Sequence, residues 1–120
     1  MAQENCLQDI ELYKKRSLSL KDALELLSGK WKLVVLLHLY HHGTSRFKDL
    51  QEGCVSISPK VLSKELQNLE INQLITRTVN NTIPVTVSYA ITEHALEIEP
   101  VIKALVEFGM KHRLKIIAAK

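Results

Sequence analysis

The feature that most constrains the fold of this chain is a change in the spacing of its apolar residues. A segment with the spacing of a helix is followed at once by one in which apolar and polar residues alternate, as in a strand. Three leucines recur at the spacing of one helix face: Leu62, Leu66 and Leu69. Ser58 can cap this helix, and Pro59 suits its first turn because the missing N–H costs nothing there. Beyond Leu74, apolar residues alternate with threonines and other polar residues, which is typical of strands. We therefore predict a helix over residues 59–72 and a β-hairpin over residues 74–91.

The face of this helix opposite the leucines carries side chains that could contact another molecule. At about 100° per residue, Lys60, Lys64 and Gln67 fall on that face. Taken alone, these residues could equally form an ordinary solvated helix surface. A helix that packs through leucines and presents lysine and glutamine outward can also dock on a core and contact nucleic acid at the same time.

The preceding residues predict three further helices. The first, KDALELL, ends near Gly29, and the second, WKLVVLLHLYHH, is apolar nearly all round and closes at Gly43. Its tryptophan is expected in the core. The third, RFKDLQE, can be capped by Thr44 or Ser45, and Gly53 is expected to supply a left-handed residue at its end.

The segments after the lysine-bearing helix complete the predicted architecture. Asn80 and its neighbours provide the hairpin turn, because asparagine tolerates positive φ, and the loop is long enough for a mobile tip. Thr92 can cap a final helical region, and a long apolar-faced helix follows over residues 99–118. The predicted fold class is mostly α with a small β-hairpin wing, a winged helix-turn-helix.

This architecture is a single domain over residues 1–120. Residues 1–17 are the least committed and are expected to be a flexible or dimer-arm segment, while residues 44–92 contain the helix-turn-helix motif and the wing. With 46% hydrophobic and 24% charged residues, the composition is that of an ordinary globular protein. No apolar run reaches the roughly 20 residues that cross a bilayer, and the N-terminus is too acidic for a secretory signal. We therefore expect no membrane partner and a cytoplasmic location.

Charge alone is a weak indication of nucleic-acid binding. The net charge is +3 overall and only +1 between Thr44 and Thr82, so the placement of individual charges must provide any affinity for DNA. The acid-free tail after Met110 is either a solvated helix end, favoured by the helix dipole, or a further phosphate contact.

Five short segments occur in a fixed order between about Asp22 and Gly109. They are Gly29-Lys30-Trp31-Lys32, Gly43 with Arg46-Phe47-Lys48-Asp49-Leu50, Ile57-Ser58-Pro59-Lys60-Val61-Leu62, Leu66-Gln67-Asn68-Leu69-Glu70, and Pro84-Val85-Thr86-Val87-Ser88-Tyr89-Ala90-Ile91-Thr92-Glu93. This ordered set resembles the HxlR-type family of small bacterial and archaeal transcription regulators, which are winged-helix proteins related to the MarR group.

The resemblance implies a homodimer joined through the terminal helices, with residues 99–118 as the C-terminal dimerisation helix. It also implies that two recognition helices enter successive major grooves of double-stranded DNA at a two-fold symmetric operator, with half-sites about 34–36 Å apart. The expected function is a sequence-specific, dimeric DNA-binding transcriptional regulator and not an enzyme. The alternative is a winged-helix protein-interaction module without specific DNA binding, because a fold does not fix a function.

Two positions depart from the family pattern. Several relatives that sense thiol-reactive compounds carry a cysteine about fourteen residues before the tryptophan. This chain has Ser17-Leu18 at that place, and its N-terminal cysteine, Cys6, lies eleven residues before Ser17. An electrophile or oxidant switch of the usual kind is therefore in doubt. Ala95 stands where the family favours glycine, which implies a small backbone adjustment.

The predicted DNA contacts come from the two helices of the motif and from the wing. They are Arg46, Ser56, Ser58, Lys60, Ser63, Lys64, Gln67, Arg77, Asn80 and Asn81. Lysine and glutamine can bond to base edges or to phosphate, and hydroxyls at a helix start can hold a phosphate. Ser58 is also the expected cap, and Arg46 could instead pair with Asp49. The hairpin tip has no lysine or arginine, so we expect a weak wing contribution.

The cysteines and histidines suggest weaker hypotheses. Cys6 is a candidate redox sensor, whereas Cys54 is expected to be a small packed residue, and no disulfide is expected between them. His38 and His42 share a helix face at a spacing that metals use, but nothing nearby in the sequence completes a site. We predict no metal and no cofactor. A small-molecule effector, such as a hydrophobic ligand at the dimer interface, is compatible with the sequence.

Overall fold

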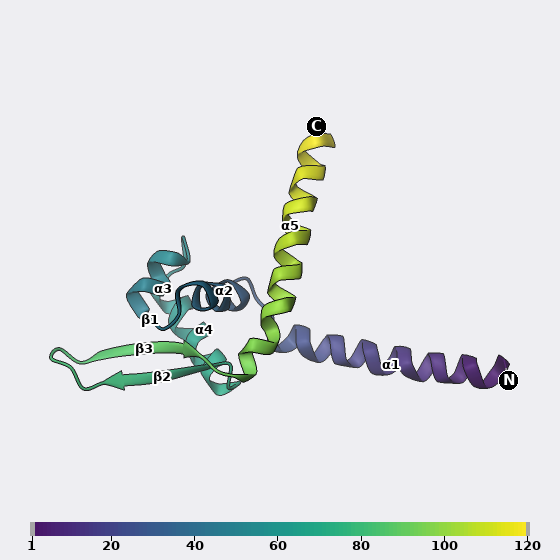
Figure 1. Ribbon diagram of the computed structural model, residues 1–120, viewed down its shortest axis with the longest axis horizontal. Helices are drawn as coiled ribbons and strands as arrows, with labels where there is room; N and C mark the ends of the chain where they lie inside the picture. The colour runs from purple at the N-terminus through teal and green to yellow at the C-terminus, as the bar shows by residue number, and fades with distance from the viewer. Residues whose placement is uncertain (1, 120) are drawn as a thin grey trace.

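The computed structural model describes the backbone of residues 2–119 and the side chains of residues 6–119; Met1 and Lys120, the last residue of the basic tail, lie outside the described residues. The elements in chain order are α1 (Ala2–Leu26), α2 (Lys32–His42), β1 (Ser45–Arg46), α3 (Phe47–Gly53), α4 (Pro59–Ile71), β2 (Ile75–Asn80), β3 (Thr86–Ile91), the 3₁₀ helix η1 (His94–Ile98) and α5 (Glu99–Ala119) (Figure 1). Helices account for 68% of the chain. The predicted fold class, a mostly helical chain with a small β-hairpin wing, is confirmed.

The sheet has three antiparallel strands in the order β1-β3-β2. The hairpin runs from the Ile75–Ile91 pair to the Asn80–Thr86 pair, close to its predicted bounds. The third strand was not predicted: Ser45 pairs with Tyr89, and Arg46 with Ser88. A strand of two residues contains no alternation, so its sequence cannot be told from a helix start.

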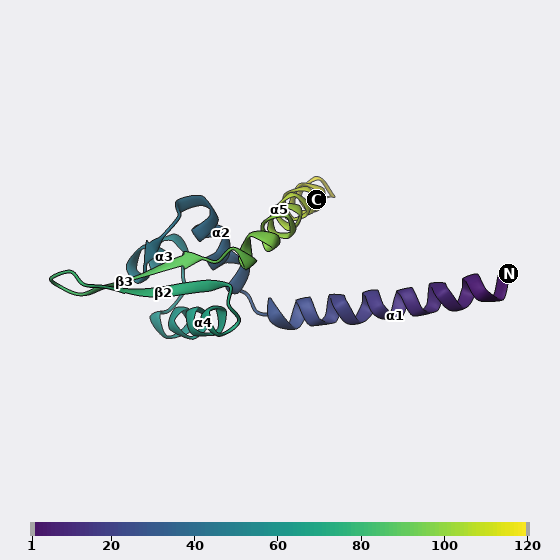
Figure 2. The same cartoon turned by 60° about the horizontal axis from the view of Figure 1, so that its bottom comes forward.

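The core lies between α2, α3, α4 and the sheet. The three leucines of α4 are buried as predicted, with exposed fractions of 0% for Leu62, 2% for Leu66 and 0% for Leu69. They join Val35, Leu36, Leu39, Leu50, Leu74 and Ile75 in one apolar cluster. Figure 2 shows α4 on one side of the hairpin and α2 on the other. Trp31 is half-buried against this cluster.

Several predicted helix ends are confirmed. Ser58 caps α4, since its hydroxyl accepts a hydrogen bond from the Val61 N–H at 3.2 Å. Gly43 ends α2 with a φ of +74°. The Thr92 hydroxyl accepts from the Ala95 N–H at 3.2 Å, as expected of a cap at the start of η1.

Two predictions about α3 are wrong. The N-cap is Arg46, whose backbone N–H donates to the Asp49 carboxylate at 3.0 Å. The Ser45 hydroxyl is unavailable as a cap because it donates to the Gly43 carbonyl. Gly53 is not left-handed; it stays within the helix, and the positive φ of this turn falls at Ser56, at +74°.

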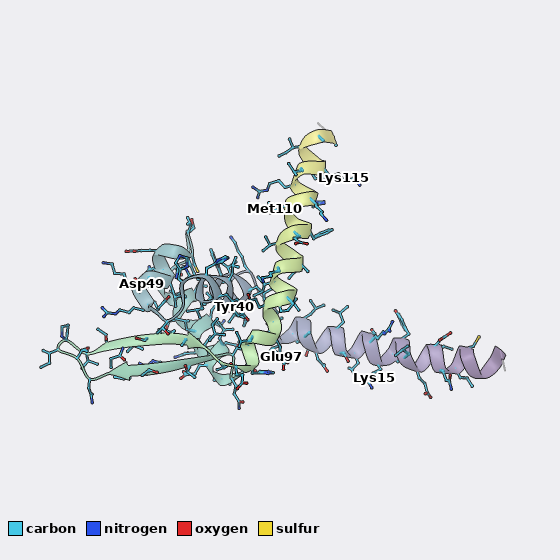
Figure 3. The ribbon with its side chains drawn as sticks, viewed as in Figure 1. Lys15, Tyr40, Asp49, Glu97, Met110 and Lys115 are labelled. Carbon is cyan, nitrogen blue, oxygen red and sulfur yellow. The ribbon has the colours of Figure 1, made fainter. Side chains whose placement is uncertain are left out.

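The terminal helices extend away from the core (Figure 1). α1 begins at Ala2, well before the predicted helix at KDALELL. In α5, Ile102 is the buried residue, and the helix beyond it is exposed; Figure 3 shows Met110 and Lys115 on that free part. The radius of gyration is 18.8 Å, whereas a compact domain of this length has about 14 Å. No helix within the described residues has the length and apolar character of a membrane span.

A hydrogen bond joins α2 to the 3₁₀ helix η1 at the base of α5. The Tyr40 hydroxyl of α2 donates a hydrogen bond to the Ala95 carbonyl of η1. Burial raises the pKa of Tyr40, and the Glu99 carboxylate adds to this rise. Ala95 is fully buried, so this contact ties α5 to the core through η1.

Candidate nucleic-acid interface

The turn between α3 and α4 is held by two buried side chains. Cys54 and Ile57 are 1% and 6% exposed, and the Ile57 N–H donates to the Cys54 carbonyl at 3.2 Å. Burial of these two residues turns Val55 and Ser56 outward, where both are exposed. Ser56 therefore stands at the start of α4 beside the Ser58 cap, where its hydroxyl can reach a phosphate.

The outward face of α4 carries the polar side chains that the sequence placed there. Lys60, Lys64 and Gln67 are all exposed, and they lie opposite the buried leucines. The ion pairs found among residues 6–119 are Lys32–Glu65 and Lys103–Glu99, so neither lysine of this face is neutralised by a carboxylate. Both ammonium groups are free to meet phosphates or base edges.

Arg77 lies beside α4 and away from the hairpin tip. It pairs with Tyr89 in the middle of the hairpin and lines a groove of about 340 Å³ together with Ser63, Gln67 and Glu70 of α4. Ser63 and Arg77, which were predicted separately, therefore belong to one surface between the helix and the wing.

The two predicted asparagines differ in their surroundings. The Asn80 amide donates to the Ser88 hydroxyl at 2.7 Å and to the Thr86 hydroxyl at 3.2 Å, so it is engaged within the hairpin. Asn81 is exposed at the tip. The amide of Asn80 thus stabilises the wing and has less capacity for an external partner.

Arg46 is exposed at the start of α3. Its guanidinium forms no ion pair with Asp49 in the part of the chain that the structure describes, because the Asp49 carboxylate instead accepts from the Arg46 backbone N–H. The arrangement leaves the guanidinium available for a phosphate next to the motif.

Sequence reasoning missed the polar contact that joins α2 to α4. The Lys32 ammonium lies 2.9 Å from Glu65 Oε2, and both side chains are largely buried. The sequence does contain an indication of this contact, because Lys32 lies on the same face of α2 as Val35, Leu36 and Leu39, which are all buried. A lysine on a buried apolar face needs an acidic or hydrogen-bonding partner, because a buried charge without one is unfavourable.

The two thiols have different surroundings. The Cys6 side chain is exposed on α1, while Cys54 is buried in the turn, and burial raises the pKa of its thiol. The rings of His38 and His42 stack with centroids 4.3 Å apart. Burial lowers the pKa of His38; the charge of His42 lowers it further, and that of Asp49 opposes the shift.

The pattern of the HxlR-like helix-turn-helix family matches residues 26–116. The chain belongs to this family. The uncharacterized HTH-type transcriptional regulator YtcD of Bacillus subtilis (strain 168) is 35% identical over 99 residues, which cover 82% of this chain and 78% of YtcD.

Solved structures agree with this assignment. A crystal structure of YtcD has a TM-score of 0.73 at 34% identity, covering 78% of this chain and 94% of the other. The redox regulator HypR in its reduced form has a TM-score of 0.76 at 27% identity, covering 85% and 99%. Relatives that match, YtcD among them, are named HTH-type transcriptional regulators. Together with the exposed face of α4, family membership identifies this chain as a DNA-binding transcriptional regulator of the winged helix-turn-helix type.

Proposed function

We propose that two copies of this chain form a homodimer through α1 and α5 and bind a two-fold symmetric operator in double-stranded DNA. α4 of each protomer enters the major groove, and the β2–β3 wing lies along the adjacent backbone. The observation that carries this proposal is the outward face of α4, where Lys60, Lys64 and Gln67 are exposed opposite a fully buried leucine stripe. Lysine donates to guanine O6 or N7, and glutamine bonds bidentately to adenine.

The remaining predicted residues extend this contact along the phosphate backbone. Ser56 and Ser58 bind a phosphate at the start of α4, and Arg46 binds one beside α3. Ser63 and Arg77 meet the strand that passes the groove between α4 and the wing. Asn81, at the tip, contributes least, because it is uncharged and phosphate attraction dominates affinity.

The exposed apolar surface of the terminal helices supports the dimer. The apolar side chains of α1 and α5 that lie at least half exposed include Leu7, Ile10, Leu18, Leu20, Leu24, Phe108, Met110, Leu114 and Ile117. Monomeric proteins rarely expose apolar patches of this extent. Residues 1–17 form a dimer arm in this proposal, and residues 99–118 form the dimerisation helix. Sedimentation should therefore give twice the chain mass of 13.6 kDa.

Two features support regulation of DNA binding by a small molecule or by oxidation. An apolar groove of about 200 Å³ between α2 and α5, lined by Leu33, Val34, Leu37 and Ile102 among others, suits a small hydrophobic effector near the dimer interface. Cys6 is the candidate sensor thiol because it is exposed while Cys54 is buried, and one structural neighbour is a redox regulator.

Charge reversal on α4 tests the DNA-binding part of the proposal. Lys60→Glu or Lys64→Glu should weaken operator binding by about tenfold or more, because each replaces an attraction for DNA by repulsion. Lys30→Glu is the matched control, since Lys30 is exposed in the connection between α1 and α2, outside α4 and outside the proposed dimer helices. Fluorescence anisotropy at one fixed salt concentration would measure all three. Equal effects of the three reversals would contradict the placement of α4 and favour a protein-interaction module.

A further inference from the structure

Lys32 occupies a position where a lysine is costly. It is the first residue of α2, and it is only 8% exposed. The N-terminus of a helix is the positive end of its dipole and disfavours a cation, and a buried charge is unfavourable unless it is paired. Its presence there therefore depends on its partners.

Those partners connect three segments of the fold. The Lys32 ammonium donates a hydrogen bond to the Ser28 carbonyl at 3.0 Å, in the short connection that follows α1. It also forms the ion pair with Glu65 of α4, in which the two side chains are 10% and 15% exposed. Lys32 thus links the connection after α1, the start of α2 and the middle of α4.

The ion pair differs in kind from the other contacts of α4. The leucines hold the helix by apolar burial, which is non-directional and tolerates small rotations about the helix axis. Glu65 lies at the edge of the leucine stripe, on the side away from the outward face. A rotation that breaks the Lys32–Glu65 contact would therefore also redirect Lys60 and Gln67.

We propose that Lys32 is a positioning residue: with Glu65, it sets the rotation of α4 about its own axis and so the direction in which the outward face meets the bases. This inference rests on the proposed role of α4 in the major groove. It assigns to Lys32 a part in sequence discrimination, although its ammonium is buried and never touches DNA.

The test compares affinity for the operator with affinity for random duplex DNA at one salt concentration. Lys32→Met should reduce the operator-to-random ratio by about tenfold, while random binding changes by less than about twofold, because phosphate contacts tolerate a misdirected helix and base contacts do not. Lys32→Arg, which keeps the charge, should retain most of the ratio. An unchanged ratio for Lys32→Met would overturn the proposal.

A second variant separates positioning from stability. Removing both charges, as in Lys32→Met combined with Glu65→Leu, often leaves stability unchanged or improved, so the melting temperature should recover. The operator-to-random ratio should stay low, since the double variant restores no ion pair between α2 and α4. A ratio that recovers together with the melting temperature would show that Lys32 only stabilises the fold.

The failure of this inference can be told apart from the failure of the proposed function. If Lys60→Glu weakens operator binding and Lys32→Met leaves the ratio unchanged, α4 contacts the DNA but Lys32 does not set its direction. If Lys60→Glu has no effect, α4 is not the DNA-reading element and both proposals fall.

Discussion

Replacing Gly53 by alanine should destabilise the protein, although this glycine lies within a helix. It is the last residue of α3 and has no positive φ. A Cβ at this position would lie far inside van der Waals contact with the His38 ring, against Nδ1 and Cε1. The ring also stacks on His42 with an interplanar angle of 17°, so a shift of His38 away from the Cβ would disturb that stack.

Two opposing effects decide the sign of Gly53→Ala. Alanine favours the helix over glycine by about 0.5–1 kcal/mol. Overpacking a filled site costs about 1–3 kcal/mol. The contact with His38 should therefore dominate, and the two ranges together give a net loss of about 1 kcal/mol, and at most about 2.5 kcal/mol, in the free energy of unfolding. A loss of about 1 kcal/mol lowers the melting temperature by roughly 3–6 °C for a domain of this size.

A double-mutant cycle with His38→Ala tests this reasoning by urea denaturation at fixed protein concentration. Once the ring is removed, Gly53→Ala should become stabilising by about 0.5–1 kcal/mol, because only the helix preference remains. A stabilising effect in the wild-type background would refute the argument, as would the same destabilisation in both backgrounds.

Three further outcomes are expected. Leu66→Ala should reduce the free energy of unfolding in urea by about 2–5 kcal/mol, since Leu66 is 2% exposed; a loss below about 1 kcal/mol would show a loose core. Burial lowers the pKa of His38 below its ordinary value of 6.5, so the unfolded chain binds this proton more readily and stability should fall as the pH drops through 6.5 towards the folded pKa. His38→Gln should flatten that part of a melting-temperature profile, and an unchanged profile would exclude the residue as the cause. Brief alkylation of the native protein should modify Cys6 and spare Cys54, because Cys6 is exposed while Cys54 is buried with a raised thiol pKa; equal labelling by mass spectrometry would contradict the burial of Cys54.

The elements with strong local signals were predictable from the sequence. α4 combines a serine cap, a proline in the first turn and three leucines on one face, and all of these features were confirmed. The hairpin followed from its period of two. Each signal acts over a few neighbouring residues, so no tertiary information was needed.

The features that were missed depend on contacts distant in sequence. β1 is defined only by its pairing with β3, and the need for glycine at position 53 comes from His38, which lies on another helix. The pairing of Lys32 with Glu65 likewise joins two helices. The extent of α1 escaped prediction because residues 6–25 of this helix are all exposed and so show no buried stripe to mark a helix.

Selection of binding sites from random duplex DNA tests the central claim most directly. We expect one enriched consensus with two-fold symmetry, half-sites about 10–10.5 base pairs apart, and two chains bound per site, since each α4 would enter one of two successive major grooves. No enrichment, or weak salt-sensitive binding to every sequence, would contradict a dimeric, sequence-specific regulator.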